Sequence, residues 1–203
     1  MIVRQFRFPK LTQVLASRCP QSMTWMIAFS KEENFEEFLR LFEDSDYTEV
    51  VYDAISGGLG AIHKDHHLDK NKGAFGYSRG EYERNVVRIL RESGYRIILL
   101  PEFDNTLNVK QCDGLLNNSP LEIKTIERFG LWSIRTKIQY AVKQGAEILV
   151  LNFPERSLYQ SERIAEGWRL FRNDPSSRLL NNTITTIIVI VEGAILNILK
   201  PPG

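Results

Sequence analysis

The chain has 203 residues, of which 43% are hydrophobic and 25% are charged, a composition typical of an ordinary globular protein with a substantial core. Its formal net charge is only +1, so the overall charge gives no argument for nucleic acid, and any basic surface must be local. Cys19 and Cys112 fit no zinc-binding spacing; reduced thiols are the simpler interpretation, with a disulfide left open. We expect no secretory signal in residues 1–26. We also expect no membrane span, because Glu192-Gly193 divides the most apolar stretch into two pieces of strand length.

Residues 1–60 are expected to form a helical or mixed extension of a domain that spans residues 61–203. Ser30 begins a capping box, and the helix after it carries phenylalanine and leucine at three- and four-residue spacing, with acids opposite. This apolar face is more typical of packing than of a partner-binding helix. A strand is expected at residues 48–52. The glycine-rich segment 56–60 lacks the spacing of a phosphate-binding loop.

All three histidines of the chain, His63, His66 and His67, fall in one short segment. Three interpretations stay open: a metal site with Asp65 or Asp69, a general acid or base or a phosphate contact beside a catalytic centre, and a polar surface loop. His67 is the best candidate for a supporting role, because the segment enters the next helix a short way downstream.

That helix begins at a second capping box, Ser78-Arg79-Gly80-Glu81, and ends at Gly94. Residues three and four apart share a helix face, so Glu83 lies with valine and leucine on the buried face. A carboxylate there needs a partner, either a metal ion held by other residues or a salt bridge, since burying a lone charge is costly. The exposed face carries a basic stripe of Arg84, Arg88 and Arg91.

Asn117-Asn118-Ser119-Pro120 has turn composition and separates two apolar runs, which predicts two antiparallel strands. If the loop holds an even number of residues, Asp113 pairs with Lys124, and Asp113, Glu122 and Lys124 share one face. An odd number would break this arrangement. Two carboxylates can hold a hard divalent cation, which activates water and neutralises charge on a phosphate. The lysine can position that water or stabilise the charge; a half-exposed strand with a salt bridge is the structural alternative.

A glutamate on a first helix, then Asp113, then Glu122-Ile123-Lys124 on the next strand resembles the PD-(D/E)XK nuclease superfamily. The resemblance covers residues 78–153, with Cys112 in place of the usual proline. The helix opening Gly-x-x-Glu-Arg is similar to archaeal Holliday-junction resolvases. Asp-Gly, a short turn and Glu-Ile-Lys look more like the C-terminal tRNase toxin domain of CdiA-type contact-dependent growth inhibition proteins.

The remaining elements are expected in the order that this family has. A buried strand at 95–100 precedes the two motif strands, and a helix at 133–144 and a strand at 147–153 follow them. A further helix at 157–172 and a hairpin of 183–191 with 194–199 complete the chain. We therefore expect an α/β (α+β) fold with a restriction-endonuclease-like αβββαβ core. Its mixed central sheet is flanked by helices, with an N-terminal extension and a C-terminal β-hairpin.

The resemblance implies a metal-dependent endonuclease that hydrolyses phosphodiester bonds. Mg²⁺, or Mn²⁺ or Zn²⁺, would be held by Glu83, Asp113, Glu122 and the backbone carbonyl of Ile123. Lys124 would assist the attacking water or the charged transition state. Gln139 or Lys137, from the helix after the motif, could add a polar side chain; a solvated helix face is the structural alternative for each. The stripe of Arg84, Arg88 and Arg91 would grip backbone phosphates.

The toxin-like motif implies tRNA as substrate, an immunity protein as partner, and a cytoplasmic site of action after delivery within a larger secreted protein. The second hypothesis is a DNA endonuclease, either resolvase-like or a DNA-cutting toxin. The third is an inert nucleic-acid- or protein-binding module whose polar cluster is a salt-bridge network. RNA and DNA are not distinguished by these residues, because the metal chemistry is the same on either backbone.

Overall fold

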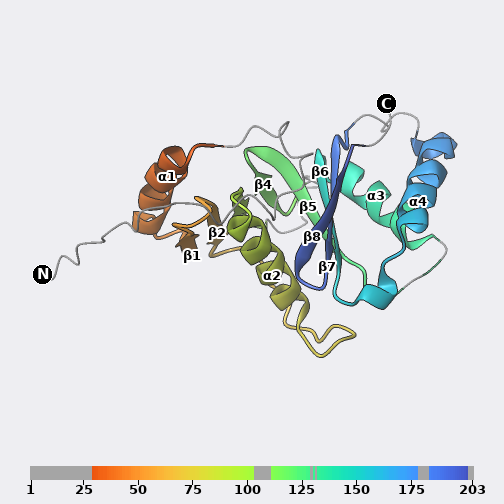
Figure 1. Cartoon of the computed structure of the whole chain (residues 1–203), viewed down its shortest axis with the longest axis horizontal. Coiled ribbons are helices and arrows are strands. Elements are labelled where there is room, and N and C mark those ends of the chain that lie inside the picture. The colour runs from red at the N-terminus through yellow and green to blue at the C-terminus, as the bar shows by residue number, and fades with distance from the viewer. Residues whose placement is uncertain (1–28, 103–110, 129, 131, 178–182, 201–203) are drawn as a thin grey trace, which may run out of the picture.

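The structure, a computed structural model, describes residues 29–102, 111–128, 130, 132–177 and 183–200. In this part of the chain, eight strands form one mixed sheet in which spatial order follows chain order (Figure 1). The strands are β1 (Tyr47–Tyr52), β2 (Leu59–His63), β3 (Arg96–Leu99), β4 (Gly114–Leu116), β5 (Ser119–Thr125), β6 (Ile148–Phe153), β7 (Thr186–Val191) and β8 (Ala194–Leu199). The α-helices are α1 (Lys31–Glu43), α2 (Arg79–Glu92), α3 (Ser133–Lys143) and α4 (Ser161–Asn173).

The predicted α/β (α+β) class, a mixed sheet flanked by helices with a C-terminal hairpin, is confirmed. Strand β3 is parallel to β2, and β5, β6 and β7 are mutually parallel, whereas the other neighbours are antiparallel. The elements α2, β3, β4, β5, α3 and β6 follow one another in the expected order of helix, three strands, helix and strand. The likeness to restriction endonucleases stays a prediction.

Helices cover both faces of the sheet. On one face, α2 packs against β2, β3 and β5, and its buried valine, isoleucine and leucine side chains belong to a cluster that also holds residues of β6 and β7. On the other, α3 and α4 pack against the neighbouring residues of β6 and β7. A smaller cluster of Leu41, Leu59, Ala61 and Ile98 joins α1 to β2 and β3. The centre of the sheet is therefore covered by apolar side chains on both faces. A polar side chain buried there requires a hydrogen-bond or ionic partner.

Both predicted capping boxes are present. The Ser78 hydroxyl accepts a hydrogen bond from the Glu81 amide at 3.2 Å, and the Glu81 carboxylate accepts one from the Ser78 amide at 2.5 Å. Ser30 and Glu33 repeat this arrangement at the start of α1. Each box satisfies two amides that a helix start leaves without intrahelical partners.

The β4–β5 hairpin is tighter than the sequence predicts. Asn117 and Asn118 both adopt positive φ angles, of 48° and 70°, as the two central residues of a type I′ turn do. Ser119 and Pro120 therefore belong to β5, and Gly114 lies opposite Leu121. The expected pairing of Asp113 with Lys124 is wrong, because this register brings Asp113 opposite Glu122.

The expected boundary between residues 60 and 61 falls inside β2, which pairs with β1 on one side and β3 on the other. The described part of the expected extension, α1 and β1, is thus built onto an edge of the same sheet (Figure 1). The expectations for residues 1–28, including Cys19, lie outside the described residues. Among the described helices, none has the length and apolarity to cross a membrane.

Candidate functional site

Asp113 and Glu122 meet at the centre of the sheet, from the residue before β4 and from the middle of β5. The Ile123 amide donates a hydrogen bond to Asp113 Oδ2 at 2.6 Å, and the Asp113 amide donates one to Glu122 Oε2 at 3.2 Å. Each carboxylate is therefore held by the backbone of the opposite strand. Glu122 is only 2% exposed, which is exceptional for a glutamate.

Lys124 lies on the same face of β5, two residues along from Glu122. Its Nζ forms an ion pair with Glu122 Oε1. The register partners of Glu122 and Lys124 on β6 are Leu149 and Leu151, which pack under α3 and α4. The structure thus brings Asp113, Glu122 and Lys124 together as the shared-face argument predicts. A shared face requires only that the number of loop residues is even. The observed two-residue loop meets this condition, as a four-residue loop would.

Burial and mutual repulsion both disfavour the charged forms of the two carboxylates. Burial raises the pKa of Glu122 to about 7; the negative charge of Asp113 adds to the rise, and Lys124 opposes it. Burial also raises the pKa of Asp113 above its ordinary value. Burial alone would lower the pKa of Lys124, but the charges of Asp113 and Glu122 outweigh it and raise that pKa. A bound cation would relieve the repulsion between the two carboxylates.

Glu83 approaches this pair from α2 and is half-buried, as expected for the inner face of that helix. Its negative charge contributes to the raised pKa values of Asp113 and Lys124, so it lies within electrostatic reach of both. Within the described residues, no hydrogen bond joins Glu83 to Asp113 or Glu122. Its partner is His66, whose Nε2 lies 3.2 Å from Glu83 Oε2.

His66 links Glu83 to the strand beside Asp113. Its Nδ1 lies 2.8 Å from the Leu100 carbonyl, and the Leu100 amide donates to the Asp113 carbonyl at 3.0 Å. A carbonyl and a carboxylate both accept hydrogen bonds, so the arrangement favours a ring protonated on both nitrogens. Burial would lower the pKa of His66, but the hydrogen bonds to Glu83 and Leu100 outweigh it and raise that pKa.

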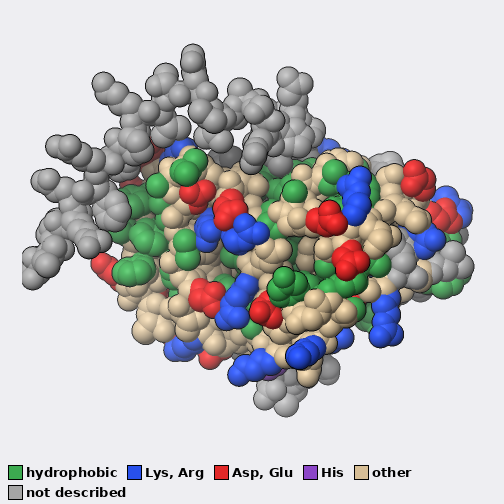
Figure 2. All heavy atoms as spheres, turned by 60° about the horizontal axis from the view of Figure 1, so that its bottom comes forward, with side chains coloured by type: hydrophobic (Ala, Val, Ile, Leu, Met, Phe, Trp, Pro, Cys, Tyr) green, Lys and Arg blue, Asp and Glu red, His purple; other side chains and the backbone are tan. Residues whose placement is uncertain are grey.

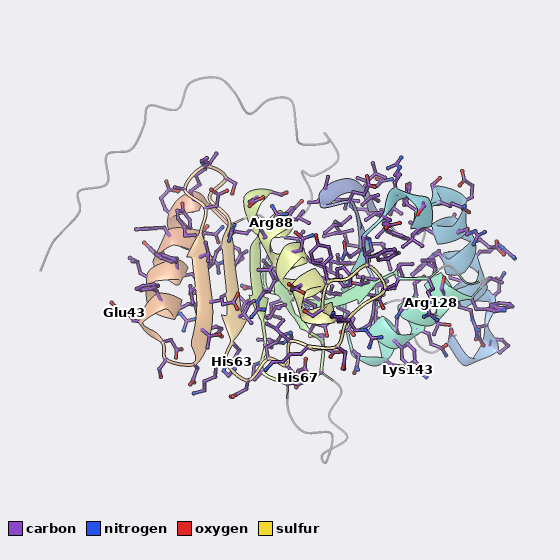
Figure 3. The ribbon with its side chains drawn as sticks, turned by 90° about the horizontal axis from the view of Figure 1, so that it is seen from below. Glu43, His63, His67, Arg88, Arg128 and Lys143 are labelled. Carbon is purple, nitrogen blue, oxygen red and sulfur yellow. The ribbon has the colours of Figure 1, made fainter. Side chains whose placement is uncertain are left out.

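Sequence reasoning selected His67, whereas the residue that contacts Glu83 is His66. His67 is exposed, and the His63 ring packs edge-on against Tyr47, with ring centroids 5.3 Å apart. His63 is the last residue of β2, and His67 lies on the loop that follows (Figure 3). The histidine-rich segment was a usable signal, but which of its side chains turns inward depends on the path of the loop.

The donor set fits a hard divalent cation. In the ranges that the structure describes, no three histidine, cysteine, aspartate or glutamate side chains are grouped closely enough to hold a metal ion. Asp113 and Glu122 still offer paired buried oxygens, and Mg²⁺ is commonly held by one or two carboxylates with waters in its other positions. Glu83 and Ile123, the further oxygen donors that the motif suggests, line one cavity together. Oxygen ligands alone favour Mg²⁺ or Mn²⁺ over Zn²⁺.

Two adjoining cavities lie beside this site, although Asp113, Glu122 and Lys124 themselves line neither. The smaller, of about 260 Å³, is lined by Glu83 and Ile123 and shares Arg79, Thr125, Glu127 and Lys137 with a larger one of about 550 Å³. Of the two α3 candidates, Lys137 lines both cavities, whereas the half-buried Gln139 lines neither. The cleft formed by these two cavities is called the basic cleft below, because lysine and arginine outnumber acids in its walls.

The arginine stripe of α2 does not reach this cleft. Arg84 pairs with Glu49 at 2.6 Å, and Arg88 and Arg91 pair with Glu92 at 2.8 and 3.3 Å. Figure 2 shows acidic and basic side chains interspersed over the face that it presents. In Figure 3, Arg88 lies away from the loop that carries His63 and His67. All three arginines are paired with glutamates, so the structure gives no support to the phosphate-binding role expected for them.

Fold and site together define an α+β protein with a buried carboxylate pair, a paired lysine and an adjoining basic cleft. No protein-family model matches the chain, no curated protein matches it, and no solved structure matches its fold. The relationship to the PD-(D/E)XK superfamily therefore stays a prediction that rests on the Asp113 and Glu122-Ile123-Lys124 motif.

Proposed function

We propose that this protein is a metal-dependent endonuclease that hydrolyses phosphodiester bonds in nucleic acid. The observation that carries the proposal is the buried pair of Asp113 and Glu122, which share one sheet face with Lys124 beside a basic cleft. Carboxylates whose pKa values are perturbed by burial and by a specific charge partner, next to a cleft, are typical of catalytic sites. The motif resemblance supports the same chemistry.

Asp113 and Glu122 would hold Mg²⁺ or Mn²⁺, with Glu83 and the Ile123 carbonyl as further donors. When bound, such an ion supplies a water of lowered pKa and neutralises charge on the phosphate. Lys124 keeps its proton at neutral pH, because the two carboxylates raise its pKa. It therefore acts as a fixed cation that stabilises negative charge on a phosphate oxygen, and not as a general base.

His66 would position Glu83. The imidazole is held by the Leu100 carbonyl and presents its second nitrogen to Glu83 Oε2. The Leu100 amide also donates a hydrogen bond to the Asp113 carbonyl. Leu100 and His66 therefore connect Glu83 on α2 to Asp113 at the start of the hairpin.

The finer identity of the substrate comes from the resemblance alone. The toxin-like motif favours tRNA as substrate, an immunity protein as partner and action in the cytoplasm. A DNA endonuclease would use the same residues.

One observation favours a different function. An ion pair between Lys124 and Glu122 is also what a structural salt-bridge network would form. In that case the protein is an inert binding module, and divalent ions would change nothing.

Cleavage assays separate these functions. Total tRNA and plasmid DNA are incubated with protein and Mg²⁺, Mn²⁺, Zn²⁺ or EDTA, using wild type, Asp113→Asn, Glu122→Gln and Lys124→Gln. Asp46→Asn is the matched control, because it removes a carboxylate that pairs with Lys64 on the surface. We expect metal-dependent products from wild type and the control, and loss on the order of 10²-fold or more in the site variants. A wild type that cuts neither substrate with any metal would contradict the proposal.

A further inference from the structure

The larger cavity of the basic cleft carries more cations than its acid can neutralise. Its walls contain Lys72, Arg79, Arg128 and Lys137 but, of acidic residues, only Glu127. Glu127 already accepts a hydrogen bond from the Ala74 amide at 2.9 Å and lies 3.7 Å from Arg79.

The other three cations are available to a ligand. Within the described residues, the side chains of Lys72, Arg128 and Lys137 form no ion pair or hydrogen bond. Burial lowers the pKa of Lys137, and the positive charges of Lys124 and Arg79 add to the effect. An anion in the cleft would neutralise this local excess of positive charge.

The two cavities connect the unpaired cations with the neighbourhood of the carboxylate pair. The smaller cavity is lined by Ile123, whose amide donates to Asp113 Oδ2, and the larger cavity, which shares Lys137 with it, adds Arg128 and Lys72. A chain of phosphates that occupied the larger cavity would lead one phosphodiester bond toward Asp113 and Glu122.

Two exposed aromatic residues adjoin wall residues of the larger cavity, one along the chain and one through a backbone hydrogen bond. Trp132 is 50% exposed and directly precedes Ser133 in the cavity wall. Tyr77 is 60% exposed, and its carbonyl accepts a hydrogen bond at 2.7 Å from the amide of Gly73, another wall residue. Large aromatic side chains usually bury most of their surface, so two that do not, beside unpaired cations, call for a ligand with flat rings and negative charge.

We propose that the basic cleft binds the phosphates of an unpaired nucleic-acid strand whose bases stack on Tyr77 and Trp132. This inference rests on the proposed nuclease function and specifies its substrate class, single-stranded nucleic acid or an unpaired loop. Bases inside a duplex are already stacked on one another and cannot reach the two rings while their phosphates occupy the cleft. Single-stranded RNA and DNA share this chemistry, and separate probes distinguish them.

Binding is measured by fluorescence anisotropy in EDTA, so that hydrolysis plays no part. The probes are fluorescein-labelled oligonucleotides of about twelve nucleotides: single-stranded RNA, single-stranded DNA and a DNA duplex. We expect the single strands to bind more tightly than the duplex by about tenfold or more.

Each part of the cleft has a matched control. Tyr77→Leu and Trp132→Leu should weaken single-strand binding by about 5- to 100-fold. Tyr140→Leu removes a similarly exposed ring whose chain neighbours, Gln139 and Ala141, line neither cavity, and should bind as wild type. Lys137→Gln should reduce the slope of log K against log salt by about 0.7, the loss of one phosphate contact. Lys143→Gln, in the last turn of α3, should leave the slope unchanged (Figure 3).

The outcomes separate this inference from the proposed function. Duplex binding as tight as single-strand binding, wild-type affinity in the Tyr77, Trp132 and Lys137 variants, or no binding of any probe would each overturn the cleft assignment. If such results accompany metal-dependent cutting, the nuclease function stands without this cleft. If the variants lose single-strand binding but wild type cuts nothing with any metal, the cleft stands and catalysis does not. Thermal denaturation of each variant confirms that it is folded.

Discussion

Asp113 and Glu122 are held together through each other's strands. The Asp113 amide donates to Glu122 Oε2, and the amide that follows Glu122 donates to Asp113 Oδ2. The separation of the two carboxylates is thus set by the β4–β5 hairpin and not by flexible side chains. Side chains fixed in this way lose little conformational entropy when they bind a ligand.

Gly114 controls how closely β4 lies against β3, next to Asp113. A Cβ at this position would lie 2.4 Å from the Ile98 carbonyl oxygen and 3.1 Å from the Leu99 Cα, both backbone atoms. We expect Gly114→Ala to lower the free energy of unfolding by about 1–3 kcal/mol and to reduce cleavage by displacing Asp113. Urea denaturation and the cleavage assay check both effects. Gly130→Ala is the control, since a Cβ there meets nothing within 4 Å; equal behaviour of the two variants would refute this prediction.

Glu122 should make the metal-free protein less stable as the pH rises. Its pKa is about 7 in the folded protein against an ordinary value of 4.5. The folded state therefore binds more protons than the unfolded state between these values, and stability falls as the pH rises through this window. The loss attributable to Glu122 is at most about 3 kcal/mol.

Carboxylates whose pKa is lowered in the folded state make stability rise with pH. The test therefore uses the difference in stability between wild type and a variant without the Glu122 carboxylate. Urea denaturation in EDTA across this window compares wild type with Glu122→Gln. The advantage of wild type over the variant should shrink as the pH rises. A difference that is constant or grows with pH would show that Glu122 is not buried against a negative charge.

His66 and His67 should differ sharply although they are neighbours. His66→Ala leaves the Leu100 carbonyl and the Glu83 carboxylate without their hydrogen-bond partner, and should cost about 1–3 kcal/mol of stability. His67→Ala, at an exposed position, should change stability by less than about 0.5 kcal/mol. Thermal or urea denaturation of the two variants measures the contrast, and a more costly His67 substitution would mean that the loop takes another path.

Local signals in the sequence predicted the elements well. Capping boxes at Ser30 and Ser78 gave the starts of α1 and α2, because those hydrogen bonds join residues only three apart. Alternation along β5 put Glu122 and Lys124 on one face. The register was wrong because Ser119 and Pro120 have turn composition, whereas the turn uses only Asn117-Asn118.

The misjudged features depend on contacts between residues far apart in the sequence. Arg84 looked free for phosphate, but it pairs with Glu49, which lies 35 residues earlier on β1. The sequence favours His67 over His66, because the partners of His66, Glu83 and Leu100, come from two other segments. Periodicity within one helix or loop carries no information about such partners.

The proposed chemistry requires Asp113 and Glu122 to hold a divalent cation jointly. Titration calorimetry with Mn²⁺ at about pH 7 tests this directly, in two buffers of different ionisation enthalpy. Wild type should bind the ion and release protons, because Glu122, with a pKa of about 7, must be ionised to serve as a ligand. Asp113→Asn and Glu122→Gln should bind far more weakly. If wild type binds Mn²⁺ no better than these two variants, the carboxylate pair is not a metal site and the proposed catalytic chemistry is contradicted.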